Sequence, residues 1–133
     1  MEVFLDDLTI LIVDDEATTA EMFSLMLENE GYQTAVVHGT GTAIRAIQQH
    51  RPNLVLVDVM MPGLSGLEFC RFIRREPDLR DLPIIIASAM SQPEDVQAGM
   101  DAGADVYLMK PISKADLMEG VEAALQSSDG PAR

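Results

Sequence analysis

Five short apolar runs, each followed by a segment with helical spacing, constrain the fold of this 133-residue chain more than any other feature. The runs are rich in Val, Ile and Leu, as expected for strands buried on both faces of a sheet. The predicted strands cover residues 9–13, 33–37, 53–57, 82–87 and 105–109. Because strands that alternate with helices are joined by right-handed crossovers, the pattern predicts an α/β fold with a parallel sheet covered on both faces.

The segments between the runs predict the helices. Helices are expected over residues 17–30, over 41–49, from 65 to Pro77, from 91 to about 101, and from 113 to 125. In the first of them Met22, Leu25 and Met26, with the flanking Phe23 and Leu27, recur at helical spacing. Ser65 and Ser91 each stand three residues before a glutamate, the spacing of a capping box that opens a helix.

The length and composition favour one soluble domain, which we expect to span residues 1–126, with a loose tail over 127–133. Twenty-two acidic against nine basic residues give a net charge of −13, which opposes binding to nucleic acid or anionic lipid and suits cations or basic protein surfaces. Cys70 is the sole cysteine and is expected to be buried. A chain without a possible internal disulfide, a signal peptide or a membrane-spanning apolar stretch is expected in the cytoplasm.

Carboxylates follow the first and third predicted strands. Five units of this kind fit a doubly wound, flavodoxin-like sheet with strand order 2-1-3-4-5, whose functional crevice lies beyond the carboxyl ends of strands one and three. Asp14 and Asp15 follow the first of these strands, and Asp58 follows the other. Three crowded carboxylates repel one another unless a cation intervenes. Mg²⁺ prefers oxygen ligands, and the absence of a Cys or His cluster argues against zinc.

Two further polar residues follow the fourth and fifth strands. Ser88 comes after IIIA, and Lys110 comes after VYLM. A hydroxyl donor, an ammonium and a metal around one aspartate can stabilise the charge that spreads over a phosphoryl group during its transfer. Asp58 would be the nucleophile and would form an aspartyl phosphate.

The chain resembles the receiver domain of two-component response regulators over residues 8–125. The motifs that carry the resemblance are LIVDD, LVLVDVMMPGLSGLE, IIIASA and GADVYLMKP, in this order and each at a strand end. The resemblance implies that Asp58 accepts a phosphoryl group from a histidine kinase or a histidine phosphotransfer protein. It implies a signalling phosphoacceptor in a phosphorelay, which catalyses only its own phosphorylation and dephosphorylation.

The same resemblance implies how the metal is held. Asp15 and Asp58 would bind Mg²⁺ directly, Asp14 would act mainly through water, and the backbone carbonyl of Met60 would be a further ligand.

The resemblance also implies a switch. Ser88 would hydrogen-bond a phosphoryl oxygen and Lys110 would pair with it, while Tyr107 would turn inward as Ser88 moves. This turn would change the surface formed by the fourth helix, fifth strand and fifth helix, and so signal by contact with a protein effector or a fused output domain. We expect no nucleic acid on this domain and no membrane.

Two local features refine these expectations. Met60 and Met90 stand two residues beyond Asp58 and Ser88, and neither side chain can orient an attacking water, which predicts slow self-dephosphorylation. The expected output surface is acidic. Its acids are Glu94, Asp95, Asp101, Asp105, Asp116, Glu119 and Glu122, and Lys114 is its main cation. This composition argues against the charge-paired dimer of winged-helix regulators.

Two other classes of protein are alternatives. One is a pseudo-receiver, an interaction module that keeps the fold without phosphotransfer; the intact set of Asp15, Asp58, Ser88 and Lys110 weighs against it. The other is a hydrolase or nucleotide-binding enzyme on a similar sheet. The chain has no phosphate loop of the G-x-x-x-x-G-K type and no DxD pair after the first strand.

Overall fold

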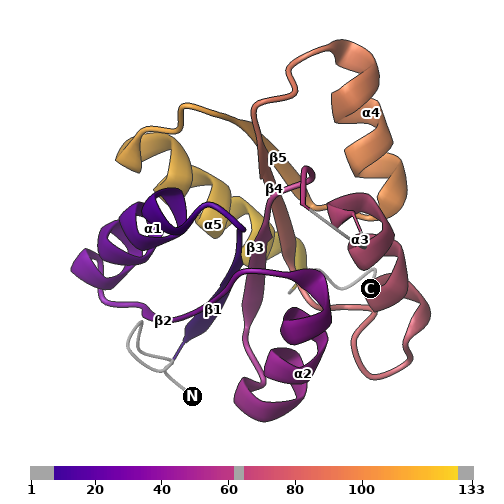
Figure 1. The fold of residues 1–133 in the computed structure, drawn as a ribbon, viewed down its shortest axis with the longest axis horizontal. Helices are drawn as coiled ribbons and strands as arrows, with labels where there is room; N and C mark the ends of the chain where they lie inside the picture. Colours follow the sequence, from indigo (N-terminus) through magenta and orange to yellow (C-terminus); the bar gives the residue numbers. More distant parts are fainter. Residues whose placement is uncertain (1–7, 62–64, 129–133) are drawn as a thin grey trace.

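Residues 8–61 and 65–128 are described in the computed structural model, and they form five strands that alternate with five helices (Figure 1). The elements are β1 (Thr9–Val13), α1 (Ala17–Asn29), β2 (Gln33–Val37), α2 (Thr40–His50), β3 (Leu54–Val57), α3 (Gly66–Arg75), β4 (Ile84–Ser88), α4 (Pro93–Ala102), β5 (Val106–Met109) and α5 (Lys114–Ser128). The strands are parallel in the order β2-β1-β3-β4-β5. The predicted fold class and strand order are confirmed.

Helices cover both faces of the sheet. α1 and α5 lie on one face, and α2, α3 and α4 lie on the other (Figure 1). Neighbouring residues of each central strand enter opposite cores: Ile10 and Ile12 pack with α1 and α5, whereas Leu11 and Val13 pack with α2 and α3. This two-sided burial explains why the strands read as continuous apolar runs.

The pairing of the central strands fixes which side chains can meet beyond them. Val13 at the end of β1 is level with Val57 at the end of β3. The next backbone group continues this pairing, because the Asp58 amide donates to the Val13 carbonyl at 3.0 Å. Asp14, which follows β1, and Asp58, which follows β3, are therefore brought side by side.

The buried face of α1 includes only part of the predicted apolar pattern. Ala20, Phe23 and Leu27 are the buried residues of this helix. Phe23 and Leu27 thus pack as part of the apolar pattern, whereas Met22 and Leu25 of the same pattern are 46% and 62% exposed. The segment is apolar on most of its circumference, so spacing alone does not determine which side packs on the sheet.

The start of α4 and the end of α5 also differ from the predictions. α4 is capped by Gln92, whose amide donates to Asp95 at 3.1 Å, so its capping box lies one residue beyond the expected Ser91. Pro93 is at the first helical position, where its fixed φ suits the start of a helix. α5 extends to Ser128, two residues into the expected tail, and residues 129–133 lie outside the described ranges. Ser65 caps α3 as predicted, accepting from the Glu68 amide at 3.2 Å.

The single cysteine lies in the core between the sheet and α3. Cys70 is fully buried, as expected, and contacts other core residues of this face. Burial raises the pKa of its thiol to about 12. Cys70 is therefore a structural apolar residue in the folded protein.

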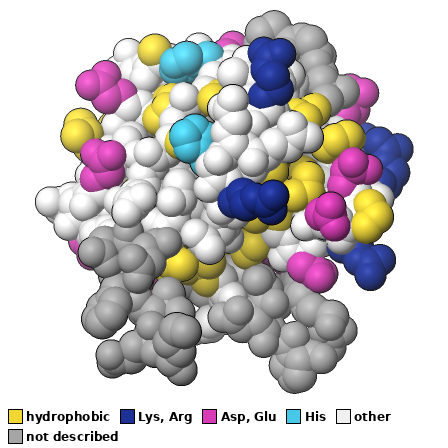
Figure 2. Space-filling view, turned by 90° about the horizontal axis from the view of Figure 1, so that it is seen from below, with side chains coloured by type: hydrophobic (Ala, Val, Ile, Leu, Met, Phe, Trp, Pro, Cys, Tyr) yellow, Lys and Arg dark blue, Asp and Glu magenta, His cyan; other side chains and the backbone are white. Residues whose placement is uncertain are grey.

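On one face of the molecule, positive and negative side chains are interspersed. On the face seen in Figure 2, Lys and Arg side chains are separated from one another by acidic, hydrophobic and uncharged side chains. Among the described helices, none is long and apolar enough to cross a membrane.

Arg74 of α3 joins three segments at the amino-terminal edge of the sheet, an arrangement that the sequence pattern did not indicate. Its guanidinium donates to Asp105 at 3.0 Å, and to the carbonyl oxygens of Gly103 at 2.9 Å and Leu82 at 2.7 Å. Asp105 also accepts from the Ile84 amide at 2.9 Å. This mostly buried ion pair therefore links α3 to the starts of β4 and β5.

Replacing Arg74 is expected to destabilise the fold strongly. Arg74→Ala removes the guanidinium that pairs with the Asp105 carboxylate and donates to several carbonyl oxygens, and we expect the free energy of unfolding to fall by about 3 kcal/mol. Urea denaturation followed by circular dichroism measures this change. The matched control is Arg75→Ala, which removes an exposed arginine from the same helix and should cost less than about 0.5 kcal/mol. Equal losses in the two variants would contradict the role of Arg74.

Candidate functional site

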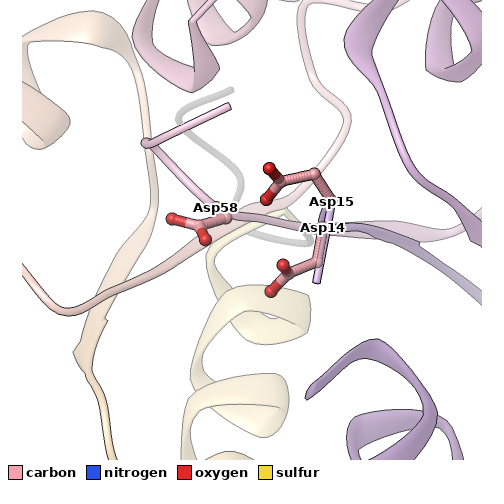
Figure 3. Close-up of side chains that lie close together, drawn as sticks. All are labelled: Asp14, Asp15 and Asp58. Atoms are coloured by element: carbon pink, nitrogen blue, oxygen red, sulfur yellow. The ribbon is translucent and has the colours of Figure 1, made fainter. Parts of the chain in front are cut away.

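Three carboxylates meet beyond the ends of β1 and β3. Asp14 and Asp15 follow β1 and Asp58 follows β3, and Figure 3 shows their side chains pointing the same way. Carboxylate oxygens of the three residues lie within 4.8 Å of one another. Asp14 is only 2% exposed, whereas Asp15 is open to solvent. The structure thus brings together the three acids that the sequence places at these strand ends.

Lys110 neutralises part of this cluster from the end of β5. Its ammonium donates to Asp14 at 2.9 Å and to Asp58 at 3.2 Å. Burial acts to lower the pKa of Lys110, but the hydrogen bond to Asp14 and the charges of Asp58 and Asp14 outweigh it and raise this pKa. Lys110 is therefore fully protonated below the ordinary lysine pKa of 10.5, and loses its charge only as the pH rises through the higher pKa of the folded state.

Each carboxylate oxygen of Asp58 has a donor. The Met60 amide donates to Oδ1 at 3.0 Å, and Lys110 donates to Oδ2. The Asp58 side chain keeps 12% exposure, and Met60 itself is exposed. An ionised carboxylate at the end of a buried strand is thus compensated by two donors while one edge remains open.

Ser88 and Tyr107 are linked through the loop that precedes α4. Ser88 ends β4 with no exposure, and its hydroxyl accepts from the Met90 amide at 3.1 Å. Tyr107 donates its hydroxyl to the Met90 carbonyl at 2.7 Å. Burial raises the pKa of Tyr107, and hydrogen bonding with Ser88 opposes this shift. The predicted switch residues are therefore connected through one backbone segment.

The donor set of the acidic cluster fits a hard divalent cation. All three side chains offer oxygen atoms, and one of them faces solvent, as an ion that keeps several waters requires. Within residues 8–61 and 65–128, this is the one group of three or more acidic, His or Cys side chains close enough to hold a metal. His38 lies near it: its Nδ1 is 3.0 Å from the carbonyl oxygen of Asp14, a contact that the sequence analysis did not foresee.

Comparison with known proteins identifies the class. A family model for the response regulator receiver domain matches residues 10–122, so the chain belongs to this family. It is a signalling domain of two-component systems.

The relatives include complete regulators. The DNA-binding response regulator MtrA of Mycobacterium tuberculosis is 42% identical over 121 residues, which are 90% of this chain and 51% of that protein. The phosphate regulon regulator PhoB of Escherichia coli is 35% identical over 88% of this chain and 51% of its own length. The chain therefore spans about half the length of these curated relatives.

Solved structures share the fold. The receiver domain of a histidine kinase from Syntrophus aciditrophicus is 38% identical, with a TM-score of 0.81, over 89% of both chains. The chemotaxis protein CheY4 of Vibrio cholerae is 28% identical, with a TM-score of 0.83, over 89% of this chain and 98% of its own.

Magnesium binding is expected to depend on Asp15. Asp15→Asn removes a charge from the solvent-facing side of the cluster. We expect its affinity for Mg²⁺, measured by isothermal titration calorimetry, to be weaker by about tenfold or more. Glu21→Gln removes an exposed charge of α1 outside the cluster and should leave the affinity unchanged. If the two variants weaken binding equally, the ion responds to the overall charge of −13 rather than to this site.

Proposed function

We propose that this domain receives a phosphoryl group on Asp58 and passes on the signal through contact with another protein or a fused output domain. The observation that carries the proposal is the position of the Asp58 carboxylate. It is held by Lys110 and the Met60 amide, lies beside Asp14 and Asp15, and keeps an open edge. The donor is a histidine kinase or a histidine phosphotransfer protein, and the site works in the cytoplasm.

The proposed reaction moves one phosphoryl group. A carboxylate oxygen of Asp58 forms a bond to phosphorus while the bond from phosphorus to the donor's imidazole nitrogen breaks. The electron pair of the broken bond stays on the imidazole, which takes a proton from solvent. Lys110 provides a positive charge for the phosphoryl oxygens, since its ammonium already reaches Asp58.

Bound Mg²⁺ would stabilise the negative charge that spreads over the phosphoryl oxygens. Asp15 and Asp58 would hold it directly and Asp14 mainly through water. The Met60 carbonyl would complete the protein ligands. The proximity of the three carboxylates supports this assignment.

The proposed switch begins at Ser88. Its hydroxyl leaves the Met90 amide to hydrogen-bond a phosphoryl oxygen, and Tyr107, which is bonded to the Met90 carbonyl, moves with the same loop. A local change of charge thus alters the surface of α4, β5 and α5. We propose that this domain binds no nucleic acid itself, since its net charge of −13 repels phosphate backbones.

Asp58 is expected to be the residue that is phosphorylated. Acetyl phosphate with Mg²⁺ should add the mass of one phosphoryl group to the intact protein, measured by mass spectrometry. Asp58→Asn should abolish the addition, because the amide is not a nucleophile of this kind. Asp81→Asn, at an exposed aspartate before the start of β4 and so at the opposite edge of the sheet from the site, is the matched control and should be phosphorylated normally.

Two other results would identify the alternative classes of protein. A wild-type protein that gains no mass with acetyl phosphate or with a phosphorylated histidine kinase is a pseudo-receiver. Repeated turnover of a generic phosphate ester, independent of Asp58, would instead indicate a hydrolase.

The lifetime of the phosphorylated state is expected to depend on Met60. Its thioether cannot orient a water for attack on phosphorus, so we expect slow self-dephosphorylation. Met60→Asn supplies an amide that can position the water, and should accelerate the loss of phosphate severalfold in a time course. Met100→Asn changes an exposed methionine of α4 and should decay at the wild-type rate. An unchanged rate in Met60→Asn would refute this explanation.

A further inference from the structure

A groove lies between β5 and α5, outside the acidic cluster. It has a volume of about 340 Å³, and its lining includes Leu108 and Ile112 on one side and Gly120 and Ala123 on the other. Among residues 8–61 and 65–128, β5 is an edge strand, and no further strand of this part of the chain covers this side of the sheet. The groove exists because α5 presents two small residues here: a Cβ at position 120 would lie 3.0 Å from a methyl group of Leu108.

The rim of the groove is acidic and has no internal counter-charge. Asp116 and Glu119 line it, and both are exposed. The described residues that line it include no Lys or Arg. The two cations nearest in sequence are already paired, because Lys110 bonds to Asp14 and Asp58, and Lys114 forms an ion pair with Glu30 at 2.9 Å. The negative charge of the rim is therefore available to a partner.

We propose that this groove binds a basic segment of another protein, with one large apolar side chain in the hollow beside Gly120 and Lys or Arg side chains against Asp116 and Glu119. Apolar contact supplies burial, and charge complementarity selects the partner. A second copy of this chain is a poor occupant, because its matching face would place further carboxylates against the same rim.

The groove is connected to the candidate phosphorylation site. Tyr107 lines it, and the same tyrosine bonds to the Met90 carbonyl in the loop whose amide donates to Ser88. Binding of the basic segment should consequently respond to phosphorylation. This response rests on the proposed function, whereas the groove and its charge do not.

A synthetic amphipathic peptide of Lys and Leu tests the proposal, with ¹⁵N-labelled full chain and no phosphate donor. We expect its addition to shift the backbone amide resonances of Leu108, Ile112 and Gly120. Two control peptides, one with Glu in place of Lys and one with Ala in place of Leu, should each bind more weakly by about tenfold or more.

Matched variants locate the binding. Glu119→Lys should weaken binding about tenfold, whereas Glu122→Lys makes the same change of charge on α5 outside the groove lining and should weaken it less than about twofold. Ala123→Leu should weaken binding by filling the hollow, with its far-ultraviolet circular dichroism unchanged. Equal effects of the two lysine variants, or resonance shifts spread over all acidic surfaces, would overturn the proposal.

Two further measurements separate the possible failures. Sedimentation that shows a dimer strengthened by Glu119→Lys would identify a second copy as the occupant and overturn the proposal. After acetyl phosphate and Mg²⁺, the peptide affinity should change in the wild type but not in Asp58→Asn. If the peptide binds but acetyl phosphate adds no phosphoryl group to Asp58, the proposed function is refuted and the proposal for the groove stands. If Asp58 is phosphorylated but the peptide does not bind, the proposal for the groove is refuted and the proposed function stands.

Discussion

The crowding of three carboxylates at adjacent strand ends is the constraint on which the rest of the site depends. The pairing of β1 with β3 places Asp58 beside Asp14, at the ends of two strands whose side chains are almost all buried. Such a cluster needs positive charge, and part of it comes from Lys110, which is 52 residues further along the chain than Asp58. The long-range order of the sheet and the local chemistry of the site therefore support each other: the fold brings Lys110 to the cluster, and its charge stabilises the buried Asp14 and the partly buried Asp58.

Most of this site was predictable because a parallel sheet collects the carboxyl ends of its strands at one edge. Once the apolar runs were recognised as strands, the residues after them had to lie near one another, whatever their distance in sequence. Asp14, Asp15, Asp58 and Lys110 meet in this way.

The features that the sequence did not predict have different physical origins. The orientation of α1 depends on which side chains complement the sheet, and Met22 and Leu25 fit helical spacing as well as the residues that pack there. The cap of α4 lies at Gln92 rather than at Ser91, next to a proline at the first helical position. Arg74 and Asp105 are separated by 31 residues, and no local pattern marks a guanidinium that bonds to carbonyl oxygens of other segments.

The restraints on α4 are unequal at its two ends. Its carboxyl end continues into Gly103, whose carbonyl is held by Arg74, and into the Asp105 ion pair. Its amino end follows the loop in which Met90 is held by hydrogen bonds from Tyr107 and to Ser88. A rigid helix that is held more firmly at one end than at the other rotates about the firmly held end. If a phosphoryl group on Asp58 draws Ser88 toward it, as proposed, α4 would rotate about its carboxyl end at the amino-terminal edge of the sheet, and its amino end would move furthest.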